Sequence, residues 1–157
     1  MATTSPPTSP RWLPPRTRGD FADLVPAGAE GVVLFDGYCH LCDRSVQFVL
    51  DHDRRRAFRF APSQSPGAAP FLARCGLGSA PGTIVFVERD GWSVRSTAAI
   101  GMARRLGRPW SLATIALILP AALRDVAYRV IARNRVRWFG QRDTCRIPTP
   151  EEAGQFL

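Results

Sequence analysis

The chain has 157 residues, of which 45% are hydrophobic, and this suits a single domain able to bury its own core. Its formal net charge is +8, and all 21 of its basic residues are arginine. A solvated basic surface accounts for this charge, so we expect no nucleic-acid partner. Peripheral contact with an acidic partner or a membrane surface is left open.

Residues 1–28 are rich in Pro, Ser, Thr and Arg, and we expect a disordered tail there, followed by one domain at 29–157. No apolar segment near the start ends in a signal-peptide cleavage site. The longest apolar run, 112–123, contains Pro120 and is too short to cross a bilayer. We therefore expect a cytoplasmic protein, in which a Cys-x-x-Cys pair usually serves redox or metal chemistry.

Strand and helix signals alternate through the domain. In chain order they predict a strand at 31–35, a helix at 42–52, a strand at 58–61, a helix from 65 to 76 or 78, a hairpin of strands at 83–87 and 92–95, a helix at 97–106 with Ser96 as its N-cap, and helices at about 109–119 and 121–138. This is an α/β order, β-α-β-α-β-β-α, with two additional C-terminal helices. It matches the thioredoxin-like core.

The last predicted helix carries an apolar stripe of Val126, Val130 and Ile131, with several arginines elsewhere on its surface. We expect this stripe to pack on the sheet or on the preceding helix. The alternative is a basic amphipathic surface that docks on anionic lipid or on an acidic partner.

Cys39 and Cys42 lie three residues apart, where the first predicted strand gives way to the first predicted helix. Thiol–disulfide exchange needs one thiolate that attacks a disulfide and a second thiol that resolves the mixed disulfide. The free N–H groups and the dipole at a helix N-terminus stabilise a thiolate on the leading cysteine. We therefore expect Cys39 to be the nucleophile and Cys42, which should be the more buried, to be the resolving thiol.

A structural zinc site is an alternative for this pair, but such a site needs four ligands. The other candidates are not paired at ligand spacing: Cys75, Cys145, His40 and His52. We therefore expect no metal and no cofactor. Cys75 is expected to be a small buried core residue. For Cys145 two roles stay open, a buried residue or a third redox thiol.

Four further residues are expected to border the cysteine pair. Asp36 is either a turn residue that accepts backbone hydrogen bonds or a carboxylate that relays protons to the resolving thiol. His40 either stabilises the thiolate when it is protonated or faces solvent. Pro81 precedes the hairpin, where it is either an ordinary strand breaker or, as in thioredoxin-like proteins, a cis-proline against the pair. We expect Pro81, Tyr38 and His40 to bind the substrate.

The stretch DGYCHLC, from Asp36 to Cys42, has the pattern Asp-x-x-Cys-x-x-Cys, and a Ser-Thr-Ala-Ala segment follows the hairpin. Together with LRDVAYRVIARNRVRWFGQRDTCRIP near the end, these motifs make Gly31 to Leu157 resemble the DCC family of thiol-disulfide oxidoreductases. The resemblance implies a thioredoxin-like fold, protein-disulfide reductase activity through Cys39 and Cys42, and a site role for Asp36. The Trp-Cys-Gly-Pro-Cys surroundings of thioredoxin are absent, which leaves the direction of electron flow open.

The resemblance therefore implies an enzyme of the protein-disulfide reductase type. Its partners would be a disulfide-containing protein or small molecule and an electron donor that the sequence does not identify. The alternative is a non-catalytic thioredoxin-like interaction module, whose basic C-terminal helices bind a partner.

Overall fold

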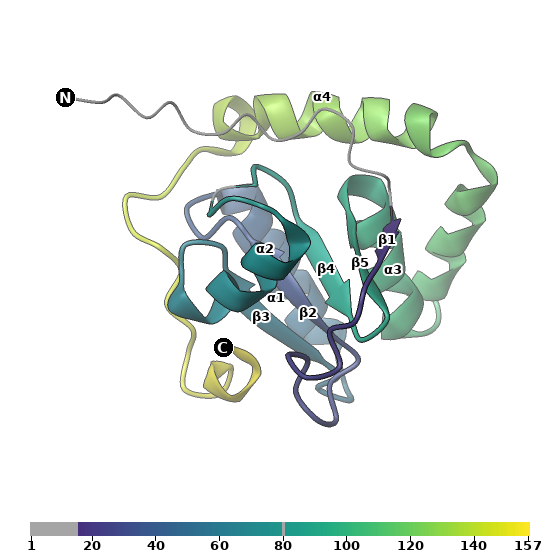
Figure 1. Ribbon diagram of the computed structural model, residues 1–157. Helices are drawn as coiled ribbons and strands as arrows, with labels where there is room; N and C mark the ends of the chain where they lie inside the picture. Colours follow the sequence, from purple (N-terminus) through teal and green to yellow (C-terminus); the bar gives the residue numbers. More distant parts are fainter. Residues whose placement is uncertain (1–15, 80) are drawn as a thin grey trace.

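The computed structural model describes residues 16–79 and 81–157. The short β-branched runs form strands, as expected, and these strands make one sheet. Helices pack on both faces of this sheet (Figure 1). The elements are β1 (Arg16–Arg18), β2 (Gly31–Phe35), α1 (His40–His52), β3 (Phe58–Pro62), the 3₁₀ turn η1 (Pro66–Ala68), α2 (Ala69–Cys75), β4 (Val85–Glu88), β5 (Gly91–Val94), α3 (Arg95–Leu106), the 3₁₀ helix η2 (Trp110–Ile118), α4 (Ala121–Phe139) and η3 (Ala153–Gln155).

The five strands form one mixed sheet in the order β1-β5-β4-β2-β3. β2 and β3 are parallel and are connected through α1, whereas β4 runs antiparallel to both β2 and β5. In the central register, Val33 faces Phe60 on one side and Phe86 on the other. This arrangement confirms the predicted α/β, thioredoxin-like fold.

Alternate residues of β2 supply the two cores. Val33 and Phe35 join the cluster under α1 and α3, while Val32 and Leu34 join the cluster under α2. All five residues of β2 are buried, as predicted for a central strand covered on both faces. The carboxyl end of this rigid strand leads directly to the cysteine motif.

Residues 16–28, which we expected to belong to a disordered tail, contribute to the fold. β1 pairs antiparallel with β5, and Arg16 forms ion pairs with Glu88 (3.3 Å) and Asp90 (3.0 Å). Phe21 and Val25 are buried in the core cluster under α2. The edge of the β4–β5 hairpin offers unpaired backbone groups that a further strand can satisfy, a long-range effect that local composition does not reveal. Residues 1–15 lie outside the described part of the chain.

Ser96 is not the N-cap of α3, because the helix begins at Arg95 and Val94 occupies the cap position. The Ser96 hydroxyl instead donates to Asp125 Oδ1 of α4 at 2.5 Å. The expected helix at 109–119 is the 3₁₀ helix η2, and α4 forms nearly as predicted.

α4 lies across one end of the domain (Figure 1), attached by polar side chains rather than by its apolar stripe. The Tyr128 hydroxyl lies 3.1 Å from Thr83 Oγ1 and accepts a hydrogen bond from the backbone N–H of Ile84 at 3.2 Å. Val126, Val130 and Ile131, which we expected to be packed, are exposed. No helix in the described ranges is long and apolar enough to cross a membrane.

Candidate active site

The turn between β2 and α1 is built around Asp36. Its backbone carbonyl accepts a hydrogen bond from the N–H of Cys39 at 3.2 Å, and its carboxylate accepts one from the N–H of Tyr38 at 3.1 Å. Asp36 therefore performs the turn function that was one of its two expected roles. The turn delivers Cys39 to the N-terminus of α1.

Cys39 is the N-cap residue of α1, with an extended backbone (φ −93°, ψ 120°). Its Sγ accepts a hydrogen bond from the backbone N–H of Cys42 at 3.4 Å. A sulfur in this position receives one of the free donors of the helix and lies at the positive end of the helix dipole. Both features stabilise a thiolate more than a neutral thiol.

Cys42 is held in its thiol form. Burial is the main cause that raises its pKa to about 12, and a hydrogen bond and the charge of Cys39 raise it further. The positive charge of Arg135 acts in the opposite direction. The pair therefore combines a sulfur that accepts an N–H bond at the start of α1 with a second sulfur that keeps its proton.

The two cysteines differ from the expected order of burial. Cys39 is only 1% exposed, whereas Cys42 is half-buried. Cys39 is covered by residues 141–146, which we call the C-terminal cover. Gln141 bridges to Cys39, and the N–H groups of Arg142 and Arg146 donate to the carbonyls of Tyr38 (2.8 Å) and Gly37 (3.0 Å). The prediction failed because this segment comes from a distant part of the chain.

Arg146 clamps the C-terminal cover onto α1. Its guanidinium pairs with Asp43 and donates to Gln47 Oε1 and to Glu152 Oε2, both at 2.9 Å. Arg142 adds a second contact to Asp43 at 3.2 Å. Because the Arg146 side chain is largely buried, these charge-assisted hydrogen bonds are little screened by solvent.

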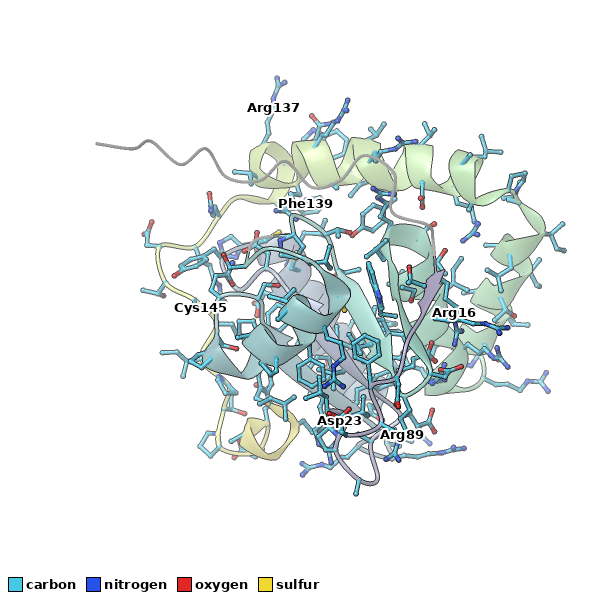
Figure 2. All side chains as sticks on the ribbon, in the orientation of Figure 1. Arg16, Asp23, Arg89, Arg137, Phe139 and Cys145 are labelled. Atoms are coloured by element: carbon cyan, nitrogen blue, oxygen red, sulfur yellow. The ribbon has the colours of Figure 1, made fainter. Side chains whose placement is uncertain are left out.

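Cys145 lies in the C-terminal cover, on the segment that runs from α4 along the side of the domain (Figure 2). Its Sγ sits where a side chain at Gly37 would be, so a larger residue at position 37 would force the Cys145 side chain to shift. Burial raises the pKa of Cys145, and the charge of Asp36 adds to this effect. By contrast, Cys75 lies in the core under α2, where burial raises its pKa to about 12.

Arg135 is a site residue that the sequence did not reveal. Its guanidinium donates to Asp36 Oδ2 at 2.9 Å and to the carbonyl of Gly82 at 3.2 Å. Gln64 completes the surroundings of Asp36 by donating to Oδ1 at 3.1 Å. Arg135 is 99 positions away from Asp36, and no local spacing separates it from the neighbouring arginines of α4.

The three expected substrate-binding residues are placed around this centre. Pro81 is buried and precedes Gly82. Arg135 donates both to the Gly82 carbonyl and to Asp36, and so connects the loop of Pro81 to Asp36. The Ala80–Pro81 peptide bond, on which the cis prediction depends, lies outside the described residues. Tyr38 and His40 are half-buried beside the C-terminal cover, where His40 lies near Gly140.

No cluster of three or more His, Cys, Asp and Glu side chains is arranged to hold a metal ion within residues 16–79 and 81–157. The free thiols of Cys39 and Cys42, rather than a set of metal ligands, are the chemically distinctive feature of the site.

The pKa of Cys42 gives a direct test of this arrangement. In Cys39→Ser, we expect the pKa of Cys42 to fall towards its ordinary value, because the charge of Cys39 is gone, but to stay above it because burial remains. At pH 9–10, a larger thiolate fraction should then make iodoacetamide alkylation of Cys42 faster than in the wild type. Site-resolved mass spectrometry measures both rates. Equal rates in the two proteins would refute the coupling.

The chain is similar in sequence to known proteins of one family. A family model described as "DCC1-like thiol-disulfide oxidoreductase" matches residues 33–141. The chain is 37% identical over 127 residues to "Uncharacterized protein YuxK" of Bacillus subtilis, covering 80% of this chain and 93% of that protein. It is also 37% identical over 120 residues to "DCC family protein At1g52590, chloroplastic" of Arabidopsis thaliana, covering 74% and 69%. No solved structure gives a significant match.

Proposed function

Because the chain belongs to the DCC1-like thiol-disulfide oxidoreductase family, we propose that it reduces disulfides in a protein or small-molecule substrate through Cys39 and Cys42. The observation that carries the proposal is the hydrogen bond from the N–H of Cys42 to Cys39 Sγ at the start of α1. It supports Cys39 as the nucleophile. The raised pKa of Cys42 supports a thiol that reacts second.

The proposed reaction has two exchange steps. The Cys39 thiolate attacks one sulfur of the substrate disulfide, and the other sulfur leaves as a thiolate that takes up a proton. Cys42 then loses its proton and attacks Cys39 Sγ, which forms the Cys39–Cys42 disulfide and releases the second substrate thiol. Two electrons pass to the substrate, and a dithiol donor must then reduce the new disulfide. We place this cycle in the cytoplasm, where a reducing pool keeps such pairs as thiols.

Asp36 is the proposed acceptor of the Cys42 proton, directly or through a water molecule. Its charge contributes to the raised pKa of Cys42, which indicates that the two groups interact. Arg135 and Gln64 hold the carboxylate in place, so Arg135 serves as a positioning residue. Pro81, Tyr38 and His40 remain the proposed substrate contacts.

Cys39 is only 1% exposed and its backbone pairs with Gln141, so we expect movement of the C-terminal cover to control access to the thiol. We expect Arg146→Gln to raise the alkylation rate of Cys39 about 10-fold, the effect of weakening closure by ~1.4 kcal/mol. Per-residue alkylation at neutral pH measures this effect.

Arg44→Gln is the matched control for Arg146→Gln, because Arg44 is an exposed arginine on α1, the helix to which Arg146 binds. Cys75 should stay unmodified in both variants and reports global unfolding. A Cys39 rate in Arg146→Gln that equals the rate in Arg44→Gln would show that Arg146 does not control access.

Mild oxidation followed by peptide mapping tests the function itself. A Cys39–Cys42 disulfide should form, and its equilibrium in glutathione buffers should give a potential more negative than about −200 mV if the pair acts as a reductant. Oxidation that leaves Cys39 and Cys42 as thiols, or that pairs Cys39 only with Cys145, would reject the proposed cycle. A less negative potential would indicate that the pair oxidises its substrate instead of reducing it.

The burial of Cys39 also supports a second candidate, a non-catalytic interaction module that acts through the basic C-terminal helices. In that case, Cys39→Ser would preserve the biological role. Reversing the charges of Arg133 and Arg137 would abolish it.

A further inference from the structure

The segment after α3 exposes apolar side chains that the proposed exchange reaction does not use. η2 contains no buried residue, and two of its side chains, Ile115 and Ile118, are 62% and 83% exposed. The chain from Trp110 to Leu123 contains no charged residue. A surface of this kind marks an interaction site in a globular protein.

The exposed side chains of η2 continue onto α4. Leu123, Val126 and Val130 follow one another at three- and four-residue spacing, which places them on one face of the helix, and all three are exposed. We call the following six residues the apolar ridge: Ile115, Ile118, Leu119, Leu123, Val126 and Val130.

The opposite face of α4 is polar, and it binds the domain. Asp125 accepts a hydrogen bond from Ser96 and pairs with Arg95 at 3.6 Å, and Tyr128 and Arg135 are engaged as described above. An ordinary amphipathic helix buries its apolar face and exposes its polar face. α4 does the reverse, so the outward ridge is a consequence of how the helix is attached.

Arginines extend the same face of α4 beyond the ridge. Arg133 and Arg137 continue the spacing of Val126 and Val130, both are exposed, and Arg137 points away from the domain (Figure 2). Between residues 109 and 142, the only acidic residue is Asp125, which is buried and paired. The surface therefore combines exposed apolar groups and exposed positive charge with no exposed acid.

We propose that the apolar ridge, with Arg133 and Arg137, docks on the surface of an anionic phospholipid bilayer. Apolar side chains would enter the boundary between headgroups and acyl chains, while the guanidinium groups pair with lipid phosphates. A symmetric contact between two copies of this chain would bury Arg133 and Arg137 against a surface that offers no exposed acid to pair with them, which disfavours self-association. Docked in this way, the ridge lies along the bilayer surface.

Vesicle flotation tests this docking. The wild type should bind vesicles of phosphatidylglycerol mixed with phosphatidylcholine, should bind vesicles of phosphatidylcholine alone much more weakly, and should lose binding in high salt. Ile118→Asp and the double variant Arg133→Gln/Arg137→Gln should each lower the partition onto the anionic vesicles at least about 10-fold.

Matched controls test whether binding depends on this surface in particular, rather than on any exposed apolar side chain or on the net charge of the protein. Ile147→Asp alters a side chain as exposed as Ile118, at 84%, in the C-terminal tail. Arg18→Gln/Arg54→Gln removes the same charge from exposed positions far from the ridge in sequence. Both controls should bind as the wild type does. Cys39→Ser should also bind normally, so failure of the redox proposal would not affect this one.

Three results would overturn the docking proposal. The folded wild type could fail to bind anionic vesicles, or both arginine double variants could lose binding equally, which would reduce the effect to net charge. Light scattering could also show a dimer that Ile118→Asp dissociates, in which case a second copy covers the ridge. Circular dichroism confirms that each variant is folded.

Discussion

Cys39→Ser is expected to abolish disulfide reduction, lowering turnover by at least about 10³-fold. A serine hydroxyl at the start of α1 is not ionised near neutral pH and cannot form a mixed disulfide, so the first exchange step is lost. Turnover is measured as the reduction of insulin disulfides with dithiothreitol as the electron donor. The background rate of dithiothreitol alone sets the limit of detection.

Cys75→Ser is the matched control for this loss. Cys75 lies in the core cluster under α2, away from the cluster that contains Cys42 and the α1 face of the sheet. We expect Cys75→Ser to keep wild-type turnover. If Cys39→Ser retained more than a small fraction of the wild-type rate, another thiol would have to perform the attack.

Arg135→Gln is expected to lower the free energy of unfolding by about 1–3 kcal/mol, measured by urea denaturation. The variant leaves the Asp36 carboxylate without its cation, and the two side chains are only 16% and 23% exposed. The estimate is below that for a fully buried pair, because water still reaches both groups. The Gly82 carbonyl loses a hydrogen bond as well.

Two further variants make the Arg135 prediction specific. Arg133→Gln removes an equal charge from the exposed face of the same helix and should change stability by no more than about 0.5 kcal/mol. Asp36→Asn combined with Arg135→Gln removes both charges and should recover part of the loss. If Arg135→Gln cost no more than Arg133→Gln, the ion pair with Asp36 would have no structural role.

Local patterns predicted the parts of the fold that depend on neighbouring residues. The apolar run at Gly31–Phe35 became the central strand β2, and the periodicity after Pro120 became α4. The errors came from contacts between distant segments. Ser96 was expected to cap α3, but Asp125 of α4 binds its hydroxyl, and Phe21 belongs to the core although its surroundings are rich in polar residues.

The same division applies to the candidate site. Cys39, Cys42 and Asp36 lie within seven residues, so their sequence spacing was enough to place them together at the start of α1. Arg135 and Arg146 reach the site from positions about a hundred residues away. The cover that Arg146 holds explains why Cys39, rather than Cys42, is the more buried thiol.

The outward face of α4 has a further physical explanation. Val126 and Val130 looked like core residues because apolar periodicity usually marks the buried face of a helix. Periodicity locates an apolar face but does not say what covers it. Here the ion pair of Arg135 with Asp36 and the hydrogen bonds of Tyr128 turn the polar face of α4 towards the domain. The apolar face therefore points outward.

Trapping the mixed disulfide tests the proposed chemistry most directly. Cys42→Ser should still attack a disulfide substrate but should be unable to release it, so a covalent adduct should accumulate on one residue. Intact-mass measurement followed by peptide mapping identifies that residue. We predict a substrate adduct on Cys39, reversible by dithiothreitol and absent from the double variant Cys39→Ser/Cys42→Ser. An adduct on Cys145 instead, or no adduct at all, would contradict the assignment of Cys39 as the attacking thiol.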